Sequence, residues 1–273
     1  MSELRFTKMH GCGNDFIFID CLGGEKRDLT KIAKQLCDRR FGVGADQLLT
    51  IHRSSVGDFK MEIYNADGSQ VEMCGNGIRC FAKYVRDHGL TKKTELAVET
   101  LAGIIRPRLV GDLVEVDMGE PILEGRKIPV NADGEILDHP LDVDGTVYRV
   151  TCVSMGNPHC VVYPDDPDKL DLEKLGPRFE HHPFFPNRVN TEFVKVLGPE
   201  ELRMRVWERG AGETWACGTG ACGAAVAGAL TKRHGRKVTV HLRGGDLLID
   251  WRENNRVYMT GAAVEVFEGV ARL

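Results

Sequence analysis

The sequence lacks three features that would assign it to a special class of protein. Its formal net charge is -4, so it has no basic excess with which to bind nucleic acid or an anionic membrane. No apolar run approaches the roughly 18 residues of a spanning helix, and one of the longest, Ala221 to Leu230, contains glycines. The opening MSELRFTKMHG lacks the apolar core of a signal peptide. We therefore expect a cytoplasmic protein with no nucleic-acid or membrane partner.

The composition is that of an ordinary globular protein. The chain has 273 residues, enough for one large domain or two medium ones, with 42% apolar and 28% charged residues. Nine cysteines are many, but the count is odd and the chain is long, unlike a small secreted disulfide scaffold. We expect thiols, most of them packed as small apolar side chains.

Two short segments carry the same cysteine pattern. Residues 73–80 read MCGNGIRC and residues 216–223 read ACGTGACG. Each contains Cys-Gly-x-Gly, starting at Cys74 and at Cys217, and 217 - 74 = 143. Taken alone, the first segment leaves three interpretations open: half of a metal site, half of a disulfide, or a reactive thiol.

The offset of 143 residues also aligns other polar residues. It pairs Gly13-Asn14 with Gly156-Asn157, Gln47 with Asn190, and Glu62–Asn65 with Arg205–Glu208. Because the cysteine pattern recurs at this one offset, we interpret the chain as an ancient duplication with a pseudo-twofold axis. The predicted domains are 1–118, with the tail 262–273 packed on it, and 119–261.

Apolar patterning predicts more strands than helices. The predicted strands are 16–20, 47–51, 60–64, 113–118, 149–154, 192–196, 202–207, 237–242, 247–251 and 256–260. Helices are predicted over 30–39, from Cys74 to Gly89 and over 221–230, whereas 120–144 and 164–188 look irregular. This pattern indicates an α+β fold of two pseudo-symmetric domains. Each would be a mainly antiparallel or mixed β-sheet wrapped around a central α-helix, with the active-site cleft between them.

Both patterned cysteines are predicted at helix starts. There the unpaired backbone N–H groups and the helix dipole favour an anion, so a thiol should ionise more easily. The glycines that follow let a ligand approach the backbone closely. Each segment therefore offers a thiol or thiolate beside amide donors suited to a carboxylate.

The spacing argues against a metal or a redox motif. Zinc sites use Cys-x-x-Cys knuckles or paired histidines, whereas Cys74 and Cys80 are six residues apart and would face different sides of a helix. We expect Cys80 and Cys222 to be core residues. A disulfide between Cys74 and Cys217 is disfavoured in the cytosol. Residues 218–223 match GxGxxG, but the preceding residues are polar and glycine-rich, not the strand of a dinucleotide site.

Duplication suggests a use for the two thiols. If the halves face each other, a thiolate and a thiol would flank one carbon from opposite faces. That arrangement suits stereoinversion, in which a base removes a proton on one side and an acid supplies one on the other. Amide donors would hold the substrate carboxylate and stabilise the charge that develops on it. This chemistry requires no cofactor.

At these residues the sequence resembles the diaminopimelate epimerases, which are cofactor-independent racemases with two cysteines. The matching segments are GCGNDFIFID, FGVGADQLL, YNADGSQVEMCGNGIRC, GNPHCV, RVNTEFV, WERGAGETWACGTGACG and VFEG. The family interconverts LL- and meso-2,6-diaminopimelate in lysine and peptidoglycan precursor synthesis. The resemblance therefore implies an isomerase with no cofactor, no metal and a small-molecule substrate.

The resemblance also implies roles for individual residues. Cys74 and Cys217 would be the acid/base pair, with His159 and Glu208 tuning the thiols. Substrate contacts would come from Asn14, Gln47, Asn65, Gly75, Asn76, Asn157, Asn190, Glu208, Arg209, Gly218 and Thr219. Phe267 occupies a position where many members have a tyrosine linked to dimer contacts, and a homodimer is expected. The alternatives are a related racemase or epimerase acting on proline or hydroxyproline, and a non-enzymatic zinc or redox protein.

Overall fold

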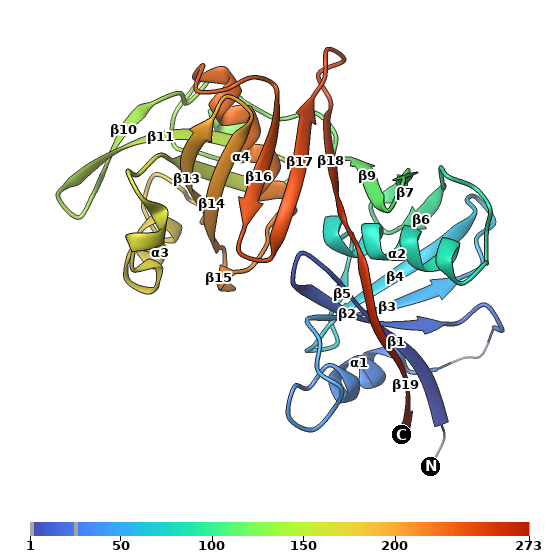
Figure 1. The fold of residues 1–273 in the computed structure, drawn as a ribbon. Helices are drawn as coiled ribbons and strands as arrows, with labels where there is room; N and C mark the ends of the chain where they lie inside the picture. Colours follow the sequence, from blue (N-terminus) through green and yellow to red (C-terminus); the bar gives the residue numbers. More distant parts are fainter. Residues whose placement is uncertain (1–2, 25–26, 273) are drawn as a thin grey trace. The chain divides into compact units, whose positions relative to one another are not determined.

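The structure is a computed structural model that describes residues 3–24 and 27–272. Two compact units divide the chain, one of residues 1–116 and 261–273 and the other of residues 117–260. The chain passes between them within β9 (Leu113–Asp117) and within β18 (Val257–Ala262). We call them unit 1 and unit 2 and describe each by itself (Figure 1). That each unit is one half of an epimerase stays a prediction.

Unit 1 is built on a mixed sheet with the order β19-β1-β2-β3-β4-β6-β7, in which β5 pairs with β4. Its strands are β1 (Glu3–Gly11), β2 (Asn14–Asp20), β3 (Gln47–His52), β4 (Phe59–Asn65), β5 (Gln70–Val71), β6 (Val98–Thr100), β7 (Gly103–Ile105) and β19 (Val264–Arg272). The helices are α1 (Leu29–Leu36) and α2 (Gly75–Asp87), and β8 (Arg108–Val110) forms a hairpin with β9. The last strand therefore pairs with the first.

Unit 2 follows the order β10-β11-β12-β13-β14-β16-β17-β18, and β15 pairs with β14. The strands are β10 (His139–Val143), β11 (Thr146–Ser154), β12 (Pro158–Val162), β13 (Asn190–Gly198), β14 (Glu201–Glu208), β15 (Gly212–Thr214), β16 (Lys237–Leu242) and β17 (Gly245–Trp251). The helices are α3 (Leu172–Glu180), α4 (Gly218–Leu230) and the short 3-10 turns η1 (Gly125–Lys127) and η2 (Pro167–Lys169).

The strand pairing repeats from one unit to the other. In unit 1, β2 pairs parallel with β3 and β3 antiparallel with β4; in unit 2, β12 and β13, then β13 and β14, pair in the same way. The register repeats too, because Phe16 lies opposite Gln47 as His159 lies opposite Asn190. Each of these pairs differs from the other by 143 residues. The duplication read from the sequence is therefore present in the backbone.

The helix that follows each patterned cysteine lies in the core of its unit. In α2 the predicted apolar stripe, Ile78, Phe81, Ala82 and Val85, is fully buried. In α4 the first turns consist of glycine, alanine and cysteine apart from Thr219, and residues 220–228 are buried on every side. A helix without a polar face is typical of a protein interior. The prediction of a central helix in each half is confirmed, and so is the burial of Cys80 and Cys222.

Several elements depart from the prediction. Strand β19 was missed because its side chains show no alternating burial: most of them are exposed, and the strand is held mainly by backbone pairing with β1. The stretches expected to be irregular contain β10 and α3. Helix α3 is hidden by Pro177 in its interior, yet Asp171 caps it by accepting a bond from the Lys174 amide. Among the described residues, no helix is long and apolar enough to cross a membrane.

Candidate active site

Cys74 is the N-cap of α2. Its backbone is extended, with φ -137° and ψ 118°, and its Sγ accepts a hydrogen bond from the Gly77 amide at 3.4 Å. A thiol sulfur thus takes the place usually held by a serine or aspartate oxygen. The next residues, Gly75 and Asn76, begin the helix, where the first N–H groups have no carbonyl partner within the helix. The predicted carboxylate-binding amides therefore lie directly beside the half-exposed thiol.

A polar network holds the Cys74 side chain in unit 1. The Asn14 Oδ1 atom accepts from the Cys74 thiol at 3.6 Å and from Asn76 Nδ2 at 3.3 Å. Asn14 in turn donates from Nδ2 to Asp46 at 2.8 Å. The structure thus brings three predicted site residues together, Asn14, Cys74 and Asn76. Another predicted pair lies on neighbouring strands, where Gln47 donates to Asn65 Oδ1 at 2.9 Å.

Charged residues that the sequence analysis did not select anchor this network. Arg39 bridges Asp15 and Asp46 at 2.7 Å each, and Lys8 contacts Asp15 at 2.6 Å. Burial acts to raise the pKa of Asp15, but hydrogen bonds from Arg39 and Lys8 outweigh it and lower that pKa to about 2. Asp15 therefore stays ionised, and its cluster fixes the loop that carries Asn14. The sequence run GNDF could have revealed this cluster, because its charged residue, Asp15, lies at the start of an otherwise apolar strand.

Cys217 is the N-cap of α4 and repeats this geometry. Its φ is -119° and its ψ is 108°, and its Sγ accepts from the Gly220 amide at 3.3 Å. The Thr219 hydroxyl lies 3.5 Å from the same sulfur. Glu208, at the end of β14, is a hydrogen-bonding partner of the thiol and accepts a short bond from the Thr214 hydroxyl. Four predicted residues, Glu208, Cys217, Gly218 and Thr219, are thus neighbours here.

The ionisation expected for Cys217 is wrong. Burial raises the pKa of the Cys217 thiol well above its usual value, and the negative charges of Glu208 and Glu192 raise it further. The hydrogen bonds from Thr219 and Gly220 lower it without reversing the balance. The effect of the helix start on the pKa is outweighed because Cys217 is only 5% exposed and two carboxyl groups lie near its sulfur. Burial also raises the pKa of Glu208.

His159 lies between two oxygens beneath α4. Its Nδ1 is 2.7 Å from Glu192 Oε1, and its Nε2 is 2.9 Å from Asn157 Oδ1. His159 and Glu192 are completely buried. Sequence reasoning selected His159 and Asn157 but missed Glu192, although an acidic residue at the start of the predicted strand 192–196, next to Phe193 and Val194, is a recognisable signal.

Asn190 and Arg209 are linked through the backbone. The Asn190 amide donates to Pro158 O at 2.9 Å, and its Oδ1 accepts from the Arg209 N–H at 2.9 Å. The Arg209 guanidinium donates to Asn187 O at 3.1 Å and is directed to the surface. Asn190 therefore sets the turn after β14, on which Glu208 and Arg209 stand.

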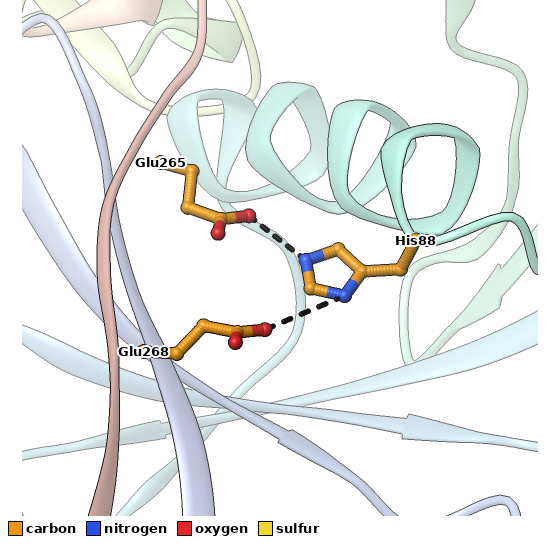
Figure 2. Close-up of side chains that lie close together, drawn as sticks. All are labelled: His88, Glu265 and Glu268. Atoms are coloured by element: carbon orange, nitrogen blue, oxygen red, sulfur yellow. Dashed lines mark hydrogen bonds and ion pairs between the residues drawn. The ribbon is translucent and has the colours of Figure 1, made fainter.

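One group of potential metal ligands stands out among the described residues, and it contains no cysteine. His88, at the end of α2, has Nε2 2.8 Å from Glu265 and Nδ1 3.8 Å from Glu268, both on β19. Figure 2 shows the two carboxylates approaching opposite nitrogens of the ring. Each carboxylate has its own ring nitrogen as a partner, and these contacts tie the tail to α2. Phe267, between these glutamates, is 46% exposed and packs edge-on against Phe6.

Comparison with known proteins places this site in a family. The family model described as diaminopimelate epimerase matches residues 6–124 and 151–266, and each stretch contains one capped cysteine. The chain belongs to the diaminopimelate epimerase family. The diaminopimelate epimerase of Moorella thermoacetica is 57% identical, over 97% of this chain and 98% of the relative. That of Acetivibrio thermocellus is 56% identical, over 97% and 98%.

Solved structures agree on the fold of this diaminopimelate epimerase family member. A phenazine biosynthesis protein of the PhzF family from Bacillus anthracis has a TM-score of 0.73 at 18% identity and covers 100% of both chains. A hydroxyproline epimerase from Agrobacterium vitis has a TM-score of 0.66 at 14% identity, covering 98% of this chain and 92% of its own. At such identities only the fold is shared. The predicted family and the predicted α+β class are both confirmed.

Proposed function

We propose that this protein is a diaminopimelate epimerase that interconverts LL- and meso-2,6-diaminopimelate by proton transfer at the α-carbon. The observation that carries the proposal is the repeated geometry of Cys74 and Cys217, each the N-cap of a buried helix in a chain of this family. Two thiols in equivalent positions are what a two-base reaction requires. The proposed acid/base pair acts without pyridoxal phosphate, metal or other cofactor.

In the proposed mechanism, one cysteine acts as a thiolate and the other as a thiol. The thiolate sulfur takes the α-proton as the Cα–H bond breaks, and the electron pair stays on the substrate, spread into its carboxylate. The S–H bond of the other cysteine then breaks as its proton forms a new Cα–H bond on the opposite face. Amides of Gly75 and Asn76, and of Gly218 and Thr219, would hold the carboxylate and stabilise its growing charge.

The substrate's distal end needs partners for both an ammonium and a carboxylate. Carbonyl oxygens of Asn14, Gln47, Asn65, Asn157 and Asn190 and the carboxyl of Glu208 would serve the ammonium groups. The guanidinium of Arg209 would serve the distal carboxylate, because its planar fork matches a carboxylate in a bidentate manner. Its placement on a turn fixed by Asn190 supports this role. Proline, the substrate of the alternative, has no distal amino-carboxylate for these groups to bind.

The proposal extends to the setting of the enzyme. It would act in the cytoplasm, in the synthesis of lysine and peptidoglycan precursors, as a homodimer. Support for a dimer comes from β19, an edge strand whose apolar side chains are exposed: Val264, Val266, Phe267 and Val270. Exposed apolar side chains on an unpaired strand edge favour association with another chain.

Exchange of the α-proton with solvent tests the proposal. The protein is incubated in deuterium oxide with LL-diaminopimelate and, separately, with L-proline, and deuterium at the α-carbon is followed by mass spectrometry. We expect incorporation and meso product with diaminopimelate only. Deuterium incorporation with proline alone would refute diaminopimelate as the substrate. The absence of exchange with both compounds would refute α-proton transfer as the reaction.

A further inference from the structure

The two cysteine sites differ most in what lies beneath the first turn of the helix. A Cβ added to Gly220 would lie 2.7 Å from Glu192 Oε1 and 3.2 Å from Cys217 Sγ, so this carboxylate lies directly against the turn that carries the thiol. A Cβ added to Gly77 would instead meet Leu49 Cδ2 at 3.1 Å. Leu49 and Glu192 differ by 143 residues, so a buried charge has replaced a buried aliphatic side chain at equivalent positions.

The Glu192 carboxylate has one strong partner. Its Oε1 lies 2.7 Å from His159 Nδ1, whereas its Oε2 has no hydrogen-bond partner among the described residues. A carboxylate with no exposure to water requires a cation or several donors to remain ionised. The His159 ring is the partner that the structure provides, because its Nδ1 faces Glu192 Oε1 while its Nε2 faces Asn157 Oδ1.

The titratable groups around Cys217 come from three strands. His159 and Cys160 lie on β12, Glu192 lies on β13 and Glu208 lies at the end of β14. Glu192 acts electrostatically on Cys217, on Glu208 and on Cys160, so it is the charge common to the group. Gly223 allows His159 to pack under the helix, because a Cβ there would lie 3.2 Å from the His159 Cβ.

We propose that Glu192 is a positioning residue for the proposed epimerase reaction: through its contact with His159 Nδ1 it holds that ring against Asn157, and from beneath the first turn of α4 it keeps the Cys217 thiol protonated in the free enzyme. Cys217 then enters the reaction as the proton donor. Cys74, whose helix rests on Leu49, supplies the thiolate once its thiol has released the proton that it donates to Asn14 Oδ1. The α-proton goes to Cys74 sulfur and the proton of Cys217 goes to carbon, so the two cysteines exchange states in one turnover. The inference rests on the proposed function only in this last step.

The ionisation of Cys217 can be measured without substrate. Wild-type protein, Glu192→Gln and Glu192→Asp are pulsed with iodoacetamide over a series of pH values, and alkylation of Cys217 and of Cys74 is read from their peptides by mass spectrometry. The midpoint of each alkylation curve reports ionisation, whereas its plateau reports access. We expect the Cys217 midpoint to fall by about one pH unit in Glu192→Gln. It should stay near the wild-type value in Glu192→Asp, which keeps the charge.

Glu180→Gln is the matched control. Glu180 is another buried carboxyl of unit 2, bonded to Trp207 Nε1 at 2.7 Å and to the Gly210 amide at 2.9 Å. Its variant should leave the Cys217 midpoint unchanged, and in Glu192→Gln the Cys74 midpoint should move less than that of Cys217. The proposal is overturned if Glu192→Gln leaves the Cys217 midpoint in place or raises it, or if Glu180→Gln moves it as far.

Two further measurements keep the test decisive. If Glu192→Gln does not fold, nitrogen NMR of wild-type protein labelled in its histidines reports the ring directly. A proton on His159 Nδ1, the nitrogen that faces Glu192, is expected, and an unprotonated Nδ1 overturns the proposal. An epimerisation assay runs in parallel. If the Cys217 midpoint shifts as expected but no epimerisation is observed, the proposed function alone is overturned. Normal epimerisation with an unmoved midpoint overturns the role of Glu192 alone.

Discussion

The two units share a backbone plan but surround their cysteines differently. In both, a parallel strand pair with the same register carries the residues beneath the capped helix. At the two equivalent positions unit 1 has Phe16 and Leu49, whereas unit 2 has His159 and Glu192, and all four side chains are buried. The copies therefore kept the position of the thiol and diverged in the charge below it.

This difference bears on what a two-base reaction needs. Two equivalent thiols in equivalent surroundings would have the same tendency to ionise, whereas the reaction starts with one protonated and one ionised. Burial and two carboxyl groups raise the pKa of Cys217, which favours the thiol there. Cys74 is partly exposed, and its thiol donates to the side-chain oxygen of Asn14. In the proposed reaction, the duplicated fold would supply the symmetry and the divergent side chains would supply the starting state.

The largest effect should come from removing either thiol. Cys74→Ala or Cys217→Ala should each lower the rate of epimerisation by on the order of a thousandfold or more, because a general base or acid is lost outright. Conversion of LL- to meso-diaminopimelate is followed by chiral chromatography. Cys80→Ala and Cys222→Ala are matched controls, since these buried cysteines lie in the same two helices, and both should stay active. Full activity in either Cys74→Ala or Cys217→Ala would refute the two-base mechanism.

A charge placed beneath Cys74 should destabilise unit 1. Leu49→Glu puts into an apolar environment the carboxyl that unit 2 tolerates, but without a histidine partner at position 16. The expected loss is about 3 kcal/mol in the free energy of unfolding, measured by urea denaturation. Leu49→Met, a control that keeps volume and polarity, should cost less than about 1.5 kcal/mol. A Leu49→Glu protein as stable as wild type would show that the apolar surroundings of Cys74 do not exclude a charge.

The Glu208 carboxyl should matter less than the thiol it contacts. Glu208→Gln keeps the shape but removes a charge that raises the pKa of Cys217, so kcat should fall about a hundredfold. The alkaline limb of the pH–rate profile should also move to lower pH in the direction that uses Cys217 as the acid. Glu213→Gln is the control, because Glu213 pairs with Arg205 at 2.8 Å and is not among the groups that shift Cys217. Equal losses in the two variants would mean that charge near Cys217 is not the cause.

The sequence predicted the parts of the site that depend on backbone plan. Cys74 and Cys217 were placed at helix starts because an apolar helical segment follows each of them, and both are N-caps. Asn14 and Asn157 were aligned by the offset of 143 residues and selected through the family resemblance, and each bonds to a predicted partner, Cys74 and His159. Local pattern is informative here because capping and turns are decided by a few neighbouring residues.

What the sequence could not predict depends on residues distant along the chain. Glu192 meets His159 across 33 positions, and Asp15 meets Arg39 across 24. Ionisation was misjudged for the same reason, because the burial of Cys217 is set by strands that pattern alone does not place beneath it. Helix α3 was missed since Pro177 interrupts the expected pattern, while packing of Phe179 into the core stabilises the helix regardless.

The smallest predicted effect concerns a thiol outside the site. Burial raises the pKa of Cys37 in unit 1 from 9.0 to about 12. Above pH 9 the thiol therefore ionises in the unfolded chain but keeps its proton in the folded one, so stability falls as pH rises from about 9 toward 12. Cys37 contributes at most about 1.4 kcal/mol per pH unit to this loss. Cys37→Ser cannot ionise and should flatten the alkaline decline in melting temperature, while its difference from wild type stays constant near neutral pH. A decline as steep as that of wild type would show that the thiol is equally ionised in both states, and that its burial contributes nothing to stability at high pH.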